Sequence, residues 1–213
     1  MKLFDLDSPI MRFLGRVADL MIVNILIILC CLPIFTIGAS VSAMYNLTIK
    51  YAKKEDDSVF RAYFKAFKQN FKQATIIWIP NMLIGIALGA AAYYLSSSET
   101  GAFLWIILAV LAFLFCLVTS MIYPMLGRYN NTTVAIIFNS INISVRNILP
   151  MLCGVFLNIA PWILAVEFTE TFLYLGLLWT FGGFSLIALL NSMVIARIFD
   201  KYTEAEPEEE AAV

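Results

Sequence analysis

The chain has 213 residues, 62% of them hydrophobic, and a formal net charge of −1. Soluble domains contain roughly 45–50% apolar residues, so this composition excludes an ordinary water-soluble core and indicates a protein whose solvent is the lipid bilayer. The chain has no histidine, which removes the commonest general base and the commonest metal ligand from its chemistry.

The first predicted element is the apolar run at residues 20–49. As one straight helix it would rise about 45 Å, well beyond a hydrocarbon core of about 30 Å. Pro33 disfavours a continuous helix, Thr36 is placed to cap a second helix over about residues 37–54, and Gly38 relieves crowding there. "CLPIFTIG" is therefore predicted to be an outer turn, and the run either two full spans or a re-entrant hairpin.

The next segment, residues 58–73, reads "SVFRAYFKAFKQNFKQ". Aromatic residues recur at helical spacing with basic residues mainly between them. Such a helix is expected to lie in the membrane interface, with its apolar face toward lipid and its basic residues near anionic headgroups. A partner protein is the alternative contact. The residues assigned to this interface are Arg61, Phe64, Lys65, Phe67, Lys68, Phe71 and Lys72.

Further along the chain, four apolar runs have about the 20 residues that a membrane span requires. They are residues 74–95, 102–126, 148–166 and 172–196. A second amphipathic segment, 132–147, precedes the third of these runs. The acidic tail at 204–213 is predicted to be disordered and solvated, with binding to a basic partner as the alternative.

The distribution of charge predicts the topology, because short loops rich in Lys and Arg stay in the cytoplasm. Basic residues lie near the N-terminus, in 50–73, in 127–147 and after the last span, whereas 96–101 and 167–171 contain none. Both termini are therefore expected inside. A cleaved signal peptide is disfavoured because basic residues follow the first run on the side that would be exported.

The sequence also suggests an internal repeat within one transmembrane domain, residues 1–203. Each unit, at 8–54, 58–129 and 132–202, would contain an interfacial helix, a span, an outer turn and a returning span. Each closes with Lys or Arg followed by Tyr, which suits snorkelling anchors at one interface. The predicted fold is thus an all-α membrane protein with six transmembrane helices arranged as three helical hairpins, and with amphipathic helices on the cytoplasmic side.

Few residues in the spans suggest chemistry. Asn24, Asn81, Asn158 and Asn191 are candidates for a polar lining that accepts an uncharged ligand such as a sugar, or they form hydrogen bonds between helices. The four cysteines lack C-x-x-C spacing and are read as small packing residues. No nucleotide loop or catalytic set is present, so we expect no catalytic, cofactor-binding or metal-binding residues.

The N-terminal half resembles the YesL-like family of bacterial membrane proteins. The resemblance lies in an L-P-x-x-T-I-G-A turn containing Pro33, Thr36, Gly38 and Ala39, and in the helix "FKAFKQNFKQA". The turn residues also have a structural explanation, as a turn and a close helix contact. The family is a domain of unknown function, typical of Gram-positive bacteria and often encoded beside carbohydrate ABC transporters.

This resemblance implies, by association, a role in oligosaccharide uptake. We expect a non-enzymatic multi-pass protein of the plasma membrane that acts as an accessory subunit or regulator of a carbohydrate ABC importer, with its permease as partner and no nucleic acid partner. The alternative is a self-contained transporter or channel for a neutral solute. A membrane enzyme is disfavoured because the spans lack histidine and carboxylate pairs.

Overall fold

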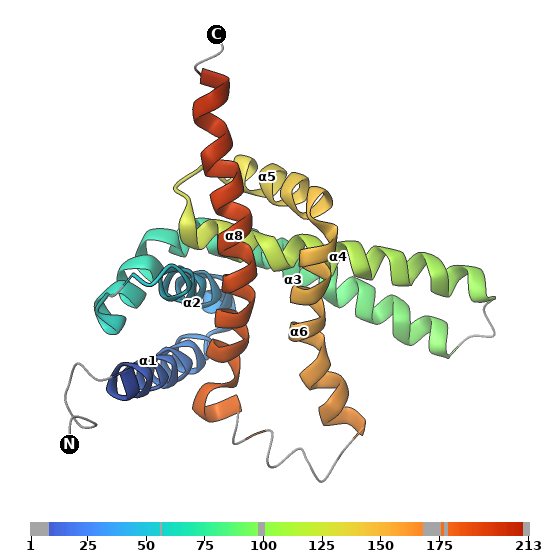
Figure 1. Ribbon diagram of the computed structural model, residues 1–213. Coiled ribbons are helices and arrows are strands. Elements are labelled where there is room, and N and C mark those ends of the chain that lie inside the picture. The colour runs from blue at the N-terminus through green and yellow to red at the C-terminus, as the bar shows by residue number, and fades with distance from the viewer. Residues whose placement is uncertain (1–8, 56, 98–100, 168–175, 177–178, 211–213) are drawn as a thin grey trace.

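The computed structural model describes residues 9–55, 57–97, 101–167, 176 and 179–210. Every regular element among them is helical (Figure 1), so the all-α prediction is confirmed. The elements are α1 Pro9–Cys30, the 3-10 helix η1 Ile34–Thr36, α2 Ile37–Ala52, α3 Val59–Ser96, α4 Ala102–Arg128, α5 Thr133–Arg146, α6 Ile148–Glu167, the π-helix η2 Trp179–Gly183 and α8 Phe184–Glu210.

Helix α2 forms the centre of the packing. It contacts α1, α3, α4 and α8, and most of its residues from Gly38 to Tyr51 are buried. Its first two turns, "IGASVSA", are rich in small residues, which lets neighbouring backbones approach closely, as in membrane helix pairs. With 16 residues α2 is about 24 Å long, shorter than a hydrocarbon core of about 30 Å.

Helix α3 differs from the prediction at its N-terminal half. Residues 58–73 do not form a separate interfacial helix, because α3 continues without a break from Val59 to Ser96. The physical reason is a single buried stripe that runs through both halves and packs against α2. It comprises Val59, Ala62, Tyr63, Ala66, Asn70, Ala74 and Ile77. No glycine or proline interrupts the helix before Pro80, and α3 continues through that residue.

The second amphipathic segment behaves differently. Helix α5 ends at Arg146 and α6 begins at Ile148, and the two axes are bent by 104° at Asn147. Asn147 leaves the helical region, with φ −121° and ψ 45°. Pro150 favours the break, because its ring would clash with the carbonyl of Arg146 in a continuous helix.

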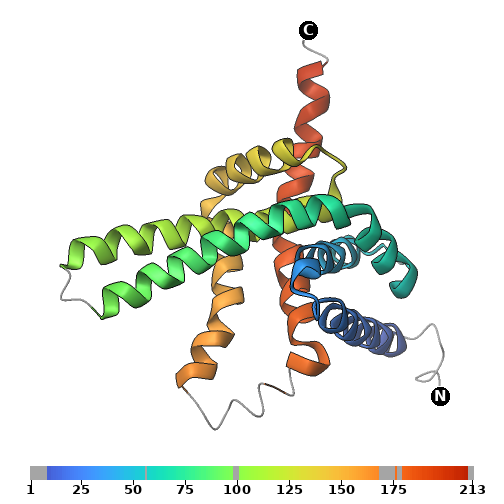
Figure 2. The same ribbon diagram turned by 180° about the vertical axis from the view of Figure 1, so that it is seen from behind.

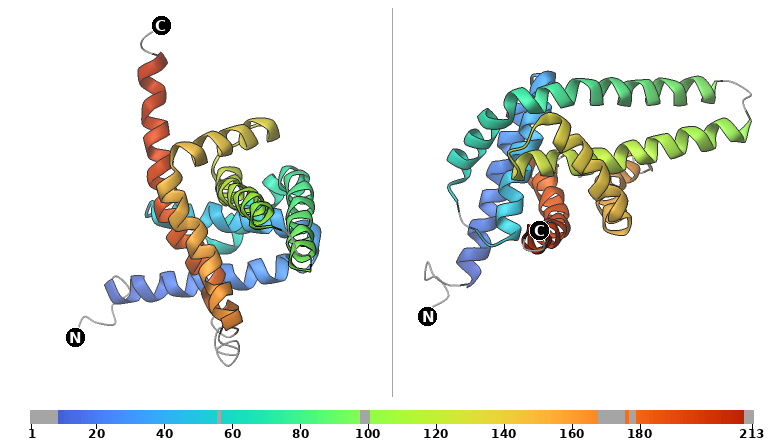
Figure 3. Two further views of the ribbon diagram at one scale, coloured as in Figure 1. Left: turned by 90° about the vertical axis from the view of Figure 1, so that its right-hand side faces the viewer. Right: turned by 90° about the horizontal axis from the view of Figure 1, so that it is seen from above.

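The long helices do not run in one common direction. Helices α3 and α4 form an antiparallel hairpin that extends away from the other elements, and α6 and α8 run crosswise to it (Figures 1 and 2). The view from above shows α1 and α2 packed side by side at the base of this hairpin (Figure 3). The core therefore lies where α2 meets α3, α4 and α8.

Both ends of the chain differ from expectation. The first predicted repeat unit, 8–54, has no separate interfacial helix among its described residues, because they begin with the single helix α1. Residues 204–210, where composition predicts disorder, continue α8 as helix to Glu210. The last predicted span, 172–196, lies partly outside the described residues, and its described part begins with η2 and continues as α8.

Four helices are long and apolar enough to cross a membrane. They are Ile10–Cys30, Val59–Ser96, Ala102–Arg128 and Trp179–Thr203, and the bent pair α5–α6 makes a fifth if counted as one span. These helices indicate a membrane location. Helix α2 is too short to be counted among them, so the described residues give four or five spans where the charge pattern predicts six.

Candidate functional site

The turn at residues 31–36 joins α1 to α2 and brings the predicted turn residues together. Pro33 is extended, with φ −78° and ψ 122°. Thr36 does not cap α2 through its side chain as expected. Its hydroxyl instead donates to the carbonyls of Cys30 at 2.5 Å and Pro33 at 2.6 Å. Thr36 therefore closes the end of α1, because carbonyls left unpaired at a helix end need donors.

Helix α3 holds this turn from the side. The indole Nε1 of Trp78 donates a hydrogen bond to the carbonyl of Ile34 at 2.8 Å. The rings of Phe35 and Phe71 pack edge to face, with their centroids 6.5 Å apart. A Cβ added to Gly38 would lie 2.8 Å from the Ala74 carbonyl oxygen, so only glycine allows this approach. Ala39 is fully buried beside it.

The outer surface of the turn is apolar and exposed. The exposed fractions are 74% for Leu32, 62% for Ile34 and 54% for Phe35. The backbone of the turn is thus fixed by hydrogen bonds while these three side chains remain largely exposed. Such a rigid apolar projection suits contact with lipid or with another protein.

Among the residues predicted to form a polar lining, Asn24 forms hydrogen bonds between elements. It is fully buried, and its Nδ2 donates to the carbonyls of Trp179 at 2.7 Å and Thr180 at 2.9 Å. Its Oδ1 accepts from the backbone N–H of Ser185 at 3.2 Å. Asn24 therefore joins α1 to the point where the π-helix η2 becomes α8.

The other three asparagines lie on three other helices, α3, α6 and α8. Asn81 accepts from Thr119 at 3.0 Å, which joins α3 to α4. Asn191 is 2% exposed and contacts the Tyr45 hydroxyl at 3.5 Å. Asn158 donates to a carbonyl of its own helix at 2.8 Å. The structure does not bring the four side chains into one chamber.

A cavity with a volume of about 650 Å³ lies between α1, α2, α6 and the start of α8. Asn158 is the only one of the four asparagines that lines it. Tyr45 and Cys31 also border it, and most of the remaining lining is aliphatic or aromatic. This chamber suits an apolar occupant better than a sugar.

Sequence reasoning missed the polar residues that join the helices most tightly. Nδ2 of Asn70 on α3 donates to Ser42 Oγ at 3.0 Å and to the Leu126 carbonyl at 2.9 Å, which links α3, α2 and α4. The hydroxyls of Thr48 and Ser192 lie 2.8 Å apart and link α2 to α8. The only sequence signal for these contacts is the presence of small polar residues within the helices. That signal does not show which residue pairs with which.

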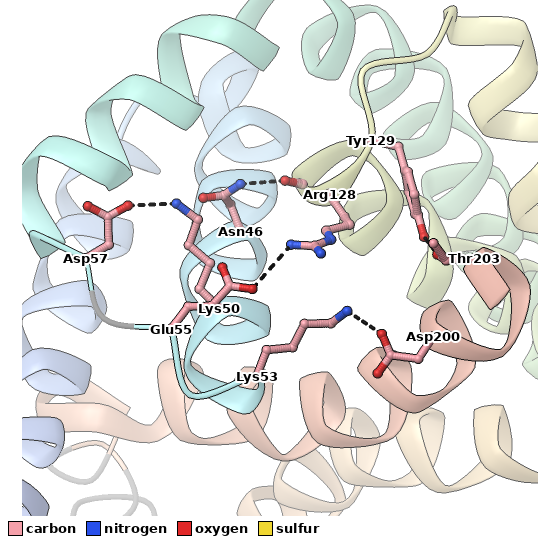
Figure 4. A network of polar contacts seen from close by, with 10 residues as sticks. Asn46, Lys50, Lys53, Glu55, Asp57, Arg128, Tyr129, Asp200 and Thr203 are labelled. Carbon is pink, nitrogen blue, oxygen red and sulfur yellow. Dashed lines mark hydrogen bonds and ion pairs between the residues drawn. The ribbon is translucent and has the colours of Figure 1, made fainter.

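A network of charged residues surrounds the C-terminal ends of α2 and α4 and the middle of α8 (Figure 4). Lys50 pairs with Asp57 at 2.7 Å, Lys53 pairs with Asp200, and Arg128 lies 4.0 Å from Glu55. The three segments for which the sequence predicts anchors at one interface therefore lie together, although the last of them lies within α8 and not at its end.

Neutral contacts complete this network. Asn46 donates to the Gly127 carbonyl at 2.6 Å, and a Cβ on Gly127 would lie 2.8 Å from the Ser42 carbonyl oxygen. The Tyr129 and Thr203 hydroxyls are 3.5 Å apart. The hydrogen bond from Lys50, reinforced by its charge, lowers the pKa of Asp57 below its ordinary value. As the pH falls, the Lys50–Asp57 ion pair therefore persists until the Asp57 carboxylate is protonated in the folded protein.

The predicted interface residues on α3 divide into two groups. Arg61, Lys65, Lys68 and Lys72 are all exposed. Among the aromatic residues, Phe64 is 41% exposed, while Phe67 and Phe71 are partly covered and pack against the core. The aromatic residue that packs most deeply on this part of α3 is Tyr63, which is fully buried.

The fold and this site define an all-helical protein with four to five helices able to cross a membrane. Residues 20–91 match the family model described as "Protein of unknown function, DUF624". This is the domain family of the YesL-like proteins, so the resemblance is confirmed over these residues. The match covers the end of α1, the turn, α2 and most of α3. The comparison with curated proteins and the comparison with solved structures gave no match.

Proposed function

We propose that this protein is a non-enzymatic accessory subunit or regulator of a carbohydrate ABC importer in the plasma membrane of a Gram-positive bacterium. In this proposal it contacts the importer's permease. In this proposal both termini lie in the cytoplasm, and α2 together with the turn returns the chain to the side on which α1 begins.

The observation that supports the proposal most directly is the rigid turn at residues 31–36. Its backbone is held by Trp78 and Thr36, while Leu32 and Ile34 remain exposed. A surface that is already ordered loses little conformational entropy when a partner binds. The YesL-like resemblance, which includes this turn, supports a carbohydrate importer as the partner.

The buried polar residues support a structural role for the helices. Asn24, Asn70 and Thr48 each form hydrogen bonds to a neighbouring helix or to η2. These groups are used in packing, which is a common role for neutral polar side chains in membrane proteins. A binding protein that works through a partner needs no further polar lining of its own.

The test is co-purification from native membranes. A C-terminally tagged protein would be extracted in mild detergent, and a sugar permease is expected in stoichiometric amount. The double substitution Leu32→Ala and Ile34→Ala should release the permease. Ile84→Ala with Ile86→Ala is the matched control, because these residues are similarly exposed, at 50% and 60%, but lie on α3 beyond the turn.

Retention of the permease by the control and loss by the turn variant would support the proposal. Recovery of the wild-type chain alone in several mild detergents would overturn it. An unchanged permease yield from the turn variant would show that the turn is not the contact surface.

The second candidate is a self-contained transporter or channel, and the cavity of about 650 Å³ favours it. Purified protein in liposomes should then mediate flux of a neutral solute without any other protein. Asn158→Leu should change that flux, whereas Asn81→Leu should not, because Asn81 lies outside this cavity. Absence of flux, or equal flux in both variants, would remove this candidate.

A further inference from the structure

The four basic residues on the N-terminal half of α3 form a straight stripe. Arg61, Lys65, Lys68 and Lys72 follow one another at intervals of four, three and four residues. At 3.6 residues per turn they fall within an arc of about 60° over a length of about 16 Å. All four are exposed, and the buried stripe that contacts α2 lies on the opposite side of the helix.

These four cations have no acidic partner within the part of the chain that the structure describes. Lys65 adds only to the electrostatic field at Asp57, without an ion pair. By contrast, Lys50, Lys53 and Arg128 all lie beside a carboxylate. The stripe therefore presents uncompensated positive charge to whatever lies next to α3.

An aromatic edge flanks one side of the stripe. Phe60 and Phe64 are 56% and 41% exposed, and Phe67 lies partly buried on the same side. The other side carries Gln69 and Gln73. Basic residues beside an apolar edge are the pattern of a helix that contacts the membrane surface, because phenyl rings enter the acyl boundary while cations meet headgroups.

We propose that this stripe binds anionic phospholipid headgroups where α3 leaves the membrane. Negative phosphates would provide the counter-charge that the described residues do not supply. The adjacent apolar edge favours a lipid over an acidic protein, since the phenyl rings would otherwise face water. This binding requires no permease and is independent of the function proposed above.

The experiment uses the full-length purified protein in vesicles of equal parts phosphatidylcholine and phosphatidylglycerol. After mild solubilisation and washing on affinity resin, retained lipid would be quantified by mass spectrometry. Wild type should retain phosphatidylglycerol above its bulk share. Arg61→Gln with Lys65→Gln and Lys68→Gln should lower the ratio of retained phosphatidylglycerol to retained phosphatidylcholine by about five-fold or more, because each basic residue contributes about five-fold in affinity at an anionic surface.

The matched control removes three exposed basic residues elsewhere, through Arg146→Gln, Arg197→Gln and Lys201→Gln. It should lose less of the wild-type enrichment than the stripe variant does. High salt should weaken the wild-type enrichment, since screening shortens electrostatic reach. Equal enrichment in wild type and the stripe variant, or an equal loss in the control, would overturn the proposal.

A second variant keeps the test valid should the triple variant fold poorly. Lys68→Gln combined with Gln69→Lys preserves net charge and moves one cation by about 100° around the helix. Both positions are exposed, so the fold should be unaffected. A lower enrichment in this variant supports a positioned stripe, whereas an unchanged value shows that net charge alone is responsible and contradicts it.

Discussion

Asn70 shows what buried polar side chains do in this protein. Its amide nitrogen holds two elements at once, through Ser42 on α2 and the Leu126 carbonyl on α4. Asn24 does the same between α1 and the start of α8. In an apolar surrounding an unpaired polar group is costly, so these residues specify which helices meet and in which register.

Asn70→Ala is expected to lower the free energy of unfolding by about 1–2 kcal/mol, because Ser42 and the Leu126 carbonyl lose a buried donor. Gln69→Ala, its exposed neighbour, is the control and should have little effect. Denaturant titration of purified protein, followed by circular dichroism, measures both. Equal stability of the two variants would show that the Asn70 bonds contribute nothing.

The sequence pointed to Asn24 but not to Asn70, for a physical reason. Asn24 lies inside an apolar run, where a lone amide stands out. Asn70 lies among lysines and glutamines in a segment expected to contact water and headgroups. Its burial, at 8% exposed, depends on α2 covering that side of α3, and no local pattern encodes which side a distant helix will cover.

At the scale of the elements, the contact between α2 and α3 organises the molecule. Gly38 lies so close to α3 that an added Cβ would be 2.8 Å from both the Ala74 carbonyl oxygen and the Cβ of Trp78. The same α3 segment supplies the indole that bonds to the turn. The turn and the helix contact therefore form one unit, contained in the residues 20–91 that match DUF624.

Gly38→Ala is expected to destabilise the protein by about 1–3 kcal/mol, because the added methyl forces α2 away from the α3 backbone. Gly89→Ala on the same α3 is the control. Nothing lies within 4 Å of its added Cβ, and alanine favours helix by up to about 1 kcal/mol. Thermal unfolding should separate the two variants in opposite directions; a shared direction would refute the close-contact explanation.

The elements were predictable where a local signal marks their limits. Pro33 and the apolar periodicity indicate the turn and both helices around it, and the structure places α2 from Ile37. The continuity of α3 was not predictable, because amphipathic and apolar halves look like different elements until one buried stripe joins them. Likewise, Pro80 and Pro150 look alike in sequence, yet only the helix before Pro150 is broken.

At the scale of the whole molecule, the charged network and the tip lie at opposite ends of the α3–α4 hairpin. Arg128 at the end of α4 belongs to the network, whereas Ser97 follows α3 at the tip. Helix α4 has 27 residues and is therefore about 40 Å long, enough to cross a bilayer. The clustered basic ends agree with a cytoplasmic network, since basic loops stay inside.

Single cysteines introduced at Lys54, Lys201 and Ser97, in a chain whose own four cysteines are replaced by alanine, test this arrangement. A membrane-impermeant maleimide should label position 97 on intact cells. Positions 54 and 201 should react only after permeabilisation. Labelling of all three on intact cells, or of 54 and 201 on opposite sides, would contradict the topology.

The shortness and deep burial of α2 have a consequence for how the chain is made. This helix leaves the ribosome early, yet Thr48 meets its partner Ser192 only 144 residues later. Until α8 is synthesised, one polar side of α2 has no protein neighbour, and its length of about 24 Å anchors it weakly in the lipid. The contact between α2 and α8 can therefore form only after the last helix has been made, and a chain that stops before α8 lacks the hydrogen-bond partner of Thr48.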